Sequence, residues 1–476
     1  MTVKGLKNHP YIPNSVPEVQ QEMLRYLGLK SLEDLHEDIP EDLKLKENMK
    51  MPEAYGSEVE LKRHVERMLQ KNKTALENTS FLGGGCWNHY VPAICDEINS
   101  RSEFLTAYGG EPYEDHGRFQ TLFEYQSLVA ELVDMEVVNV PTFDWPQAAS
   151  TALRMAARKT GRKILLVPRL MDQDKLMVIR NFCSPQLTVI EVGFQSETGL
   201  LDLQDLKKKM EENKDNVAAV YFENPSFMGF IETQGAEIAA VAKANGAETV
   251  VGVDVSSLGV LEAPVNYGAT IVCGDLQPLG VHMNYGGGQA GFMATMDIPE
   301  YVNEYPSRLF GIAPTCVNGE YGFGDVAYDR TSFHDRENAK EYVGTQAALW
   351  GITAAVYLSL MGPNGMKELG ETILQRSNYA VKKLSESKLL GEAGVKASRF
   401  SAPGFKEFVV DFSMTKLSVE DVNRKLLEKG IFGGRDLSGN FPELGHCSLY
   451  AVTEMVSQEE IENLVKALEE ILGGAR

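Results

Sequence analysis

Short apolar runs alternate with helical segments through the middle of the chain. The runs are rich in Val, Ile and Leu, as expected for strands that are buried on both faces of a sheet. They lie at Lys163–Val167, Leu187–Val192, Val217–Phe222, Thr249–Val253, Thr270–Cys273 and Ala290–Ala294. Segments with helical spacing separate several of them, at Leu203–Glu212 and Glu237–Ala244. This alternation predicts βαβ units and a mainly parallel sheet with helices on both faces.

The two ends of the chain carry a different pattern. Residues 1–80 contain short amphipathic segments separated by prolines, which predicts a helical arm that either wraps a partner subunit or packs on its own domain. Residues 331–375 have the pattern of one long apolar helix broken at Gly362-Pro363, and residues 376–476 mix strand and helix patterns. We therefore expect a helical arm (1–80), a large α/β domain (81–330), a connecting helix (331–375) and a small C-terminal α+β domain (376–476).

The charge balance and the cysteines narrow the class of protein. Lys and Arg number 46 against 67 Asp and Glu, and the formal net charge of −21 argues against nucleic acid or an anionic membrane as the main partner. The six cysteines form no C-x-x-C pair, and the N-terminal segment lacks an apolar signal core. No apolar run reaches the roughly twenty residues of a membrane helix, and the histidines do not cluster as metal ligands would. We expect a soluble cytoplasmic protein with reduced thiols and without a metal.

Polar residues follow the ends of several predicted strands. Asn224 comes after Val217–Phe222, Asp254 directly after Thr249–Val253, and Gln277 shortly after Thr270–Cys273. In open parallel sheets, ligands bind at the carboxyl ends of the strands. Asp254 is therefore a candidate catalytic residue, and His282 in the following loop is a second candidate, although a histidine is more often structural.

A second group of candidates lies at residues 100–113, where an arginine, hydroxyls and aromatics surround a Gly-Gly-Glu-Pro turn. Loops of this composition often line binding sites, and an arginine can hold a carboxylate or phosphate with two hydrogen bonds. The structural alternative for the arginine is a salt bridge at a helix end. The candidates for a substrate or interface pocket here are Arg101, Ser102, Thr106, Tyr108 and Tyr113; Asn224 and Gln277 join them.

A glycine loop at Gly83–Gly85 precedes Cys86 and a group of aromatic residues. Its backbone N–H groups are able to approach an anion, but a tight buried loop explains the glycines equally well. Cys86 has no neighbouring base in the sequence, which favours a buried structural thiol over a nucleophile.

An acidic residue at a strand end, followed by a polar loop and the turn Gly286–Gly288, resembles the pyridoxal-phosphate (PLP) site of the aminotransferase-like fold, fold type I. In that site the acid pairs with the pyridinium nitrogen, and a lysine on the following loop forms a Schiff base. This chain has no lysine between Lys243 and Lys340. The proline of Trp145-Pro146 also removes an N–H donor where the phosphate would lie, so we expect no independent cofactor site.

Longer motifs make the resemblance more specific. The chain resembles, over essentially its full length, the α subunits (subunit 1) of two-subunit glycine dehydrogenase (decarboxylating), the P-protein of the glycine cleavage system. The motifs that carry the resemblance are YIPN (11–14), SRSEF (100–104), TAY (106–108), LFEYQS (122–127), NPSFMGFIE (224–232), SLGVLEAP (257–264), QPLGVHMNYGGG (277–288), YLSLMGPNG (357–365) and AVTEM (451–455).

The resemblance implies a function as well as a fold. It implies fold type I, and a related β-type subunit that carries the PLP lysine and pairs with this chain in a heterotetramer. The complex would decarboxylate glycine and pass the aminomethyl group to the lipoyl arm of the H-protein, with PLP as the electron sink. On this reading the isolated chain is inactive, binds no PLP through a lysine of its own, and is free to form a homodimer.

Three segments depart from the family pattern. Phe143–Ala148 reads FDWPQA where these subunits usually read YDGATA, the loop from Gly109 to Gly117 is one residue shorter, and Arg336–Tyr342 also differs. These departures keep two alternatives open. One is a divergent paralogue that acts on another small amine or amino acid, and the other is a non-catalytic pseudoenzyme subunit that only binds and regulates.

Overall fold

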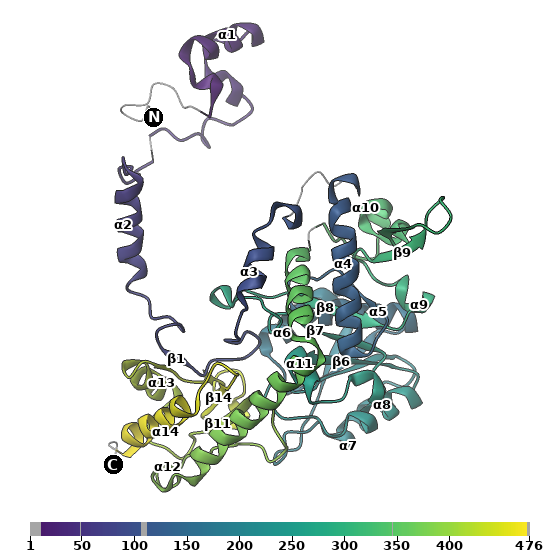
Figure 1. The fold of residues 1–476 in the computed structure, drawn as a ribbon, viewed down its shortest axis with the longest axis vertical. Helices are drawn as coiled ribbons and strands as arrows, with labels where there is room; N and C mark the ends of the chain where they lie inside the picture. Colours follow the sequence, from purple (N-terminus) through teal and green to yellow (C-terminus); the bar gives the residue numbers. More distant parts are fainter. Residues whose placement is uncertain (1–10, 48, 106–111, 345, 474–476) are drawn as a thin grey trace. The chain divides into compact units, whose positions relative to one another are not determined.

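The computed structural model describes residues 11–47, 49–105, 112–344 and 346–473. The chain divides into two compact units, residues 1–73 and 74–476, and each is described by itself (Figure 1). The expected division into four parts at residues 80, 330 and 375 stays a prediction.

The first unit consists of short helices joined by irregular segments. They are η1 (Pro13–Ser15), α1 (Pro17–Leu27), η2 (Leu32–His36) and α2 (Glu58–Leu69). A capping box forms at η2, where Asp34 accepts hydrogen bonds from the backbone N–H and the hydroxyl of Ser31. Leu24 is the one buried residue among those of this unit whose burial is described. The amphipathic helices therefore bury little of their apolar surface within the unit.

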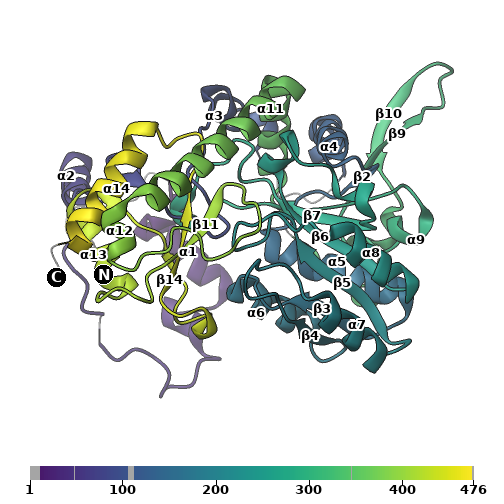
Figure 2. The same ribbon diagram turned by 90° about the horizontal axis from the view of Figure 1, so that it is seen from below.

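A seven-stranded sheet forms the centre of the second unit. The strand order is β2-β8-β7-β6-β5-β3-β4, with β8 antiparallel to both of its neighbours and the pairs from β7 to β4 all parallel (Figure 2). The strands are β2 (Val137–Val138), β3 (Ile164–Pro168), β4 (Thr188–Val192), β5 (Val217–Glu223), β6 (Glu248–Asp254), β7 (Ile271–Asp275) and β8 (Gly291–Thr295). The six strands predicted from the apolar runs are confirmed, with ends that differ by at most two residues.

Alternate side chains of each strand enter two different cores. On β5, Val220 and Phe222 pack in one core with α4, α7, α8 and α11, whereas Ala219 and Tyr221 pack in the other with α5 and α6. These helices are α4 (Pro112–Val133), α5 (Trp145–Thr160), α6 (Gln173–Cys183), α7 (Leu203–Glu212), α8 (Gly235–Ala244) and α11 (Ala348–Glu386), and a short α9 (Pro299–Val302) lies beside α5. The sheet is therefore covered on both faces, as the apolar runs predict.

The long helix starts and ends later than predicted. The expected helix at residues 331–375 is observed as α11 (Ala348–Glu386), kinked where Gly362 adopts φ 57° before Pro363. Upstream, the described residues form the short α10 (Ser332–Asp335) and the 3-10 turns η7 (Tyr328–Arg330) and η8 (Arg336–Asn338). The Ser332 hydroxyl exchanges hydrogen bonds with the backbone of Val343, and this link folds the segment back before the helix begins.

The C-terminal part forms a smaller α+β layer. Its antiparallel sheet has the order β11-β14-β13, and helices pack against it. The elements are β11 (Glu407–Asp411), β13 (Arg435–Asp436), β14 (Cys447–Ala451), α12 (Lys388–Glu392), α13 (Val419–Glu428) and α14 (Gln458–Gly473). Smaller elements of the second unit are β1 (Thr79–Ser80) paired with β12 (Ile431–Phe432), α3 (Ala93–Asn99), η3 (Ser102–Phe104), and the hairpin β9 (Phe310–Pro314) and β10 (Tyr321–Asp325).

Candidate functional site

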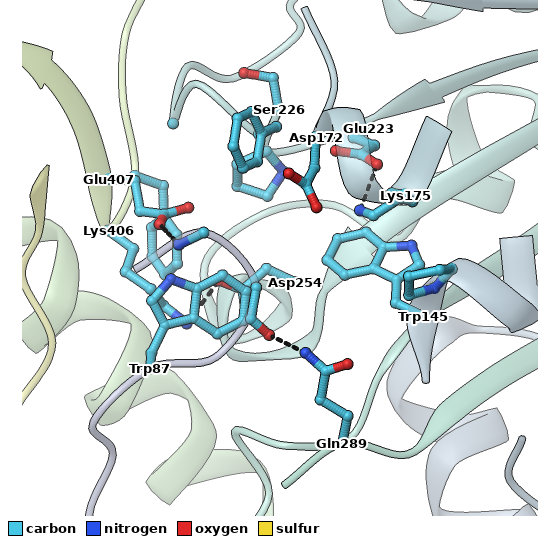
Figure 3. Close-up of a pocket in the computed structure, with 17 residues that line it drawn as sticks. Trp87, Trp145, Asp172, Lys175, Glu223, Ser226, Asp254, Gln289, Lys406 and Glu407 are labelled. Atoms are coloured by element: carbon cyan, nitrogen blue, oxygen red, sulfur yellow. Dashed lines mark hydrogen bonds and ion pairs between the residues drawn. The ribbon is translucent and has the colours of Figure 1, made fainter. Parts of the chain in front are cut away.

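A crevice opens where the order of the central strands reverses. Strand β3 has β4 on one side and β5 on the other, so the connections on its two sides run in opposite directions. Ligands of open α/β sheets bind beside the carboxyl ends of strands at such a point. The cavity there is lined by residues after β3, β5 and β6, by the first residues of α5, by the glycine loop, and by residues at the start of β11 (Figure 3).

Asp254, the predicted acid, lies at this cavity but is already paired. Its Oδ2 is 2.7 Å from the Nζ of Lys406, and its Oδ1 accepts hydrogen bonds from the N–H and hydroxyl of Ser256. Burial alone would raise the pKa of Asp254, but the ammonium of Lys406 and these donors hold the pKa below its usual range. Asp254 is thus a buried, ionised carboxylate with a cation supplied by the chain itself.

The ammonium of Lys406 has two further contacts. It lies 2.8 Å from Nε2 of His89 and 4.0 Å from the centre of the Trp87 ring. On the other side of the imidazole, Nδ1 is 2.8 Å from a carboxylate oxygen of Glu454. These partners assign the proton of a neutral His89 to Nδ1, and burial followed by the charge of Lys406 lowers the pKa of His89. Asp254, Lys406, His89 and Glu454 therefore form one continuous buried chain of polar contacts.

A second lysine forms a similar arrangement on the other side of the cavity (Figure 3). Nζ of Lys175 lies 2.6 Å from Glu223, which also accepts a hydrogen bond of 2.7 Å from the hydroxyl of Tyr221. The same ammonium lies 3.5 Å from the centre of the Trp145 ring. Each indole of the cavity therefore has a resident cation, and each of these cations has a buried carboxylate.

Two further carboxyl groups face the cavity. Burial raises the pKa of Glu407 to about 7, against the opposing effects of the Trp87 indole and the Gly84 N–H group, which donates a hydrogen bond of 2.7 Å. Burial also raises the pKa of Asp172, which lies 3.1 Å from the guanidinium of Arg435. The volume open to water inside the cavity is about 50 Å³, and on the same measure one water molecule needs about 10–15 Å³. The side chains leave room for a few water molecules.

The loop that would carry a cofactor lysine is held by structural contacts instead. The side chain of Gln277 is buried, accepts a hydrogen bond from the N–H of Trp87, and donates to the carbonyls of Trp87 and Val281. The carboxylate of Asp275 accepts hydrogen bonds from the N–H groups of Gln277, Ala290 and Trp145. Gln277 therefore ties this loop to the glycine loop and does not face a ligand.

The start of α5 is occupied by carboxylates of the chain itself. Asp144 caps the helix and accepts a hydrogen bond of 2.8 Å from the N–H of Gln147, while Asp275 accepts the N–H of Trp145 at 3.1 Å. Burial raises the pKa of Asp275 to about 6. A phosphate held at this helix start would have to displace these acids or approach them against charge repulsion.

The residues present do not fit PLP. The acid that would pair with the ring nitrogen is bound to Lys406, the helix start that would hold the phosphate is capped by Asp144 and Asp275, and the loop position of the Schiff-base lysine holds Gln277. The two lysines at the cavity are both ion-paired, and a Schiff base requires an unprotonated amine. No cofactor chemistry is therefore assigned to this chain.

The other predicted residues do not join Asp254 in the cavity. Arg101 pairs with Glu97 one helical turn before it, at 3.4 Å, which is the structural alternative. Ser102 begins η3 and is exposed, and His282 is exposed and lies 2.9 Å from Asp96 of α3. These three residues gather around α3, outside the cavity.

Asn224 has a structural role, because its side chain holds the backbone beside the cavity in place. It precedes a cis proline, accepts a hydrogen bond from the N–H of Glu232, and donates to the hydroxyl of Tyr267 at 3.3 Å. Thr106 and Tyr108 lie outside the described residues. Tyr113 belongs to α4, and its side chain also lies outside the described part of the chain.

The cavity residues that sequence reasoning missed are Lys406, Lys175, Glu223, Asp172 and Glu407. Two of them carried a recognisable signal, because Asp172 and Glu223 end or follow apolar runs at the same sheet edge as Asp254. Lys406 carried none, since it reaches the cavity from just before β11, far along the sequence from the strands of the central sheet. Burial and the nearby Asp275 raise the pKa of Cys86 to about 11, which agrees with the structural interpretation of this thiol.

No group of three or more His, Cys, Asp or Glu side chains in the described part of the chain is arranged to hold a metal ion. None of the helices described is both long enough and apolar enough to span a bilayer.

Comparison with known proteins gives a consistent result. The family model described as glycine cleavage system P-protein matches residues 9–468. A probable glycine dehydrogenase (decarboxylating) subunit 1 from Staphylothermus marinus is 37% identical, over 98% of this chain and 99% of the relative. A protein of the same description from Pyrococcus horikoshii is also 37% identical, over 98% of this chain and 100% of the relative.

Solved structures agree with these relatives. A glycine decarboxylase (P-protein) of the glycine cleavage system, in inhibitor-bound form, superposes with a TM-score of 0.83 at 31% identity, over 98% of this chain and 99% of that one. A sphingosine-1-phosphate lyase of Burkholderia pseudomallei superposes with a TM-score of 0.63 at 12% identity, over 90% of this chain and 94% of that one, which bears on the fold alone. The fold is the PLP-dependent transferase fold type I that the sequence predicts.

Proposed function

This chain belongs to the glycine cleavage system P-protein family, and from that premise we propose that it is a cofactor-free subunit of a PLP-dependent glycine decarboxylase. It works together with a second, related subunit that carries PLP on a lysine. The complex decarboxylates glycine and transfers the aminomethyl group to the lipoyl arm of the H-protein. PLP on the partner supplies the electron sink for the carbanion that remains after carbon dioxide leaves.

The observation that carries this proposal is the pairing of Asp254 with Lys406. The acid that marks a PLP site is present, but its partner is an ammonium of the same chain at 2.7 Å. The fold of a PLP enzyme combined with an internally neutralised cavity supports a subunit that has the scaffold but not the chemistry. Full-length similarity to subunit 1 proteins favours this assignment over action on another amine.

The first unit supports the need for a partner. None of the residues of α2 is buried within the first unit, where its side chains Val59, Met68 and Leu69 are all more than half exposed. A helix gains most of its stability in a protein by burying an apolar face. We expect residues 11–73 to bury these side chains against the partner subunit, as the arm alternative in the sequence suggests.

The residues around α3 are our candidates for contacts with the partner's pocket. Arg101, Ser102 and His282 are exposed, carry hydrogen-bonding groups, and lie close to one another through Asp96 and Glu97 of α3. An exposed guanidinium that is paired with an exposed glutamate can exchange it for a carboxylate across an interface. In this proposal the chain shapes the pocket and its access channel from outside.

Reconstitution tests the proposal. The chain alone, the PLP-carrying subunit alone and their mixture are each assayed for glycine-dependent exchange of carbon dioxide in the presence of PLP and H-protein. We expect exchange from the mixture only, and no borohydride-reducible PLP adduct on this chain. Exchange by the isolated chain, or a PLP adduct on one of its lysines, would contradict the proposal.

A further inference from the structure

Lys406 has the geometry of a built-in substitute for a cofactor cation. Its ammonium is 2.7 Å from Asp254 and 2.8 Å from His89, and the residue is 1% exposed. We infer that Lys406 is the residue that keeps pyridine cofactors out of this chain, because its side chain occupies the place beside the carboxylate that a pyridinium N–H group would otherwise take. The inference rests on the proposed function, in which the cofactor belongs to the partner subunit.

The backbone shows that this position is fixed by its contacts. Lys406 has φ +44°, in the left-handed region that a residue with a side chain rarely adopts. The N–H of Glu407 donates to the carbonyl of Phe405 across a tight turn, and the carbonyl of Lys406 accepts a hydrogen bond of 2.9 Å from the N–H of Val452. Strained conformations of this kind persist where surrounding contacts determine them. The turn brings the ammonium from the start of β11 to the edge of the central sheet.

The contact joins two sheets of the second unit at the site itself. Asp254 ends β6 of the central sheet, whereas Lys406 immediately precedes β11 of the C-terminal sheet. His89, from the glycine-loop segment, is held in turn by Glu454. Removal of the ammonium would leave the buried carboxylate of Asp254 without a cation, which is unfavourable unless a ligand cation replaces it.

Lys406 is placed to exclude a cofactor and not to bind one covalently. In a pyridine cofactor the ring nitrogen and the carbon that forms a Schiff base lie at opposite ends of the ring. An amine in contact with the acid therefore takes the place of the ring nitrogen and is far from the Schiff-base position. The same geometry predicts that a shortened side chain at residue 406 creates a site for a cationic nitrogen.

The ligand that fits such a site is predicted to lack a phosphate. Asp144 and Asp275 occupy the start of α5 and would repel a phosphate there, whereas the Asp254 carboxylate would attract a protonated ring nitrogen. Trp87 and Trp145 line the cavity and offer aromatic faces to a flat ring. A phosphate-free pyridine such as pyridoxine should therefore bind an opened site better than PLP does.

Titration of the full-length chain with pyridoxine and with PLP tests the inference. Two of the three tryptophans line the cavity, so quenching of their fluorescence reports binding. We expect no saturable quenching for the wild-type chain, and saturable binding of pyridoxine at least tenfold tighter for Lys406→Ala. Lys406→Met is the matched control, because it removes the charge but fills the space, and it should behave like the wild type. The double variant Lys406→Ala/Asp254→Asn should lose the binding.

A second measurement covers the case in which Lys406→Ala is poorly folded. The atoms removed from Lys406 in this variant correspond to n-propylammonium, which should raise the thermal midpoint of Lys406→Ala by several degrees. It should have no such effect on Lys406→Met, and neutral n-propanol should have none on either variant. Failure of n-propylammonium to stabilise the alanine variant selectively would overturn the inference, as would wild-type binding of pyridoxine equal to that of Lys406→Ala.

The failures of the two proposals are distinguishable. A borohydride-reducible PLP adduct on the wild-type chain would contradict the proposed function. A wild-type chain that stays inert, together with a Lys406→Ala variant that gains neither ligand, would contradict only the role of Lys406.

Discussion

Glu407→Gln should change the pH dependence of stability in a defined direction. Burial raises the pKa of Glu407 from its ordinary value of 4.5 to about 7, so the folded chain favours the protonated form. Stability linked to this group is fully present below pH 4.5 and is lost as the pH rises through 7. Because glutamine does not ionise, the variant should gain stability relative to the wild type over that range.

The magnitude follows from the two pKa values. A tenfold preference for the proton corresponds to about 1.4 kcal/mol, so a rise from 4.5 to about 7 corresponds to about 3 kcal/mol. The amide oxygen of glutamine can still accept the hydrogen bond from Gly84. The free energy of unfolding of the variant, minus that of the wild type, should therefore rise by about 3 kcal/mol between pH 4.5 and pH 8.

Urea unfolding at a series of pH values checks this prediction, with tryptophan fluorescence as the probe, because Trp87 lies beside Glu407 in the cavity. The pKa of Asp275 is also raised, but this group contributes equally to the pH dependence of the free energy of unfolding in both proteins, so its effect cancels in the difference. The exposed Glu459→Gln is the control and should show a flat difference. A flat difference for Glu407→Gln as well would refute the reasoning, because it would mean that the carboxyl is hydrated or fully paired in the native state.

Three further outcomes are expected. Lys175→Met should lower the free energy of unfolding, measured with urea, by about 3–5 kcal/mol, because it leaves Glu223 buried without its cation. The double variant Lys175→Met/Glu223→Gln should recover part of this loss. An unchanged urea midpoint in the single variant would contradict the buried pair. Gln277→Lys should destabilise the chain and yield no borohydride-reducible PLP adduct, because three hydrogen bonds are lost and the phosphate position stays acidic. Arg101→Ala and His282→Ala should each change the free energy of unfolding by less than about 0.5 kcal/mol, yet both should lower the turnover of the reconstituted complex. Full turnover would show that these residues do not act at the interface.

The fold was predictable because its information is local. An apolar run such as Val217–Phe222 is too short for a helix and too apolar for an exposed strand, and it becomes β5 within one residue. The start of the long helix was not predictable in this way, because the hydroxyl of Ser332 folds residues 332–343 back on themselves. That contact crosses a segment whose composition alone fits a helix.

The site was predictable only in part, for the same reason. The edge of the sheet was identified from Asp254, because a strand end fixes where its last side chain lies. Lys406 meets His89 across 317 residues of sequence, and no spacing or composition signals such a contact. The loop residues at 100–113 were chosen for their chemistry, and Arg101 shows that the same chemistry also serves an exposed salt bridge.

Under the proposed function, the cavity explains how this chain keeps the fold of a PLP enzyme while the cofactor belongs to the partner. Loss of a charged ligand would leave Asp254 and the start of α5 unsatisfied, and buried uncompensated groups are costly. Here Lys406 neutralises the acid, while Asp144 and Asp275 satisfy the helix start. The ion pair of Lys406 with Asp254 also joins the start of β11 to the end of β6, and so links the C-terminal sheet to the central sheet. Internal ion pairs thus take the place of a charged ligand in this cavity, and the proposed contacts with a partner are assigned to the surface around α3 and to the first unit.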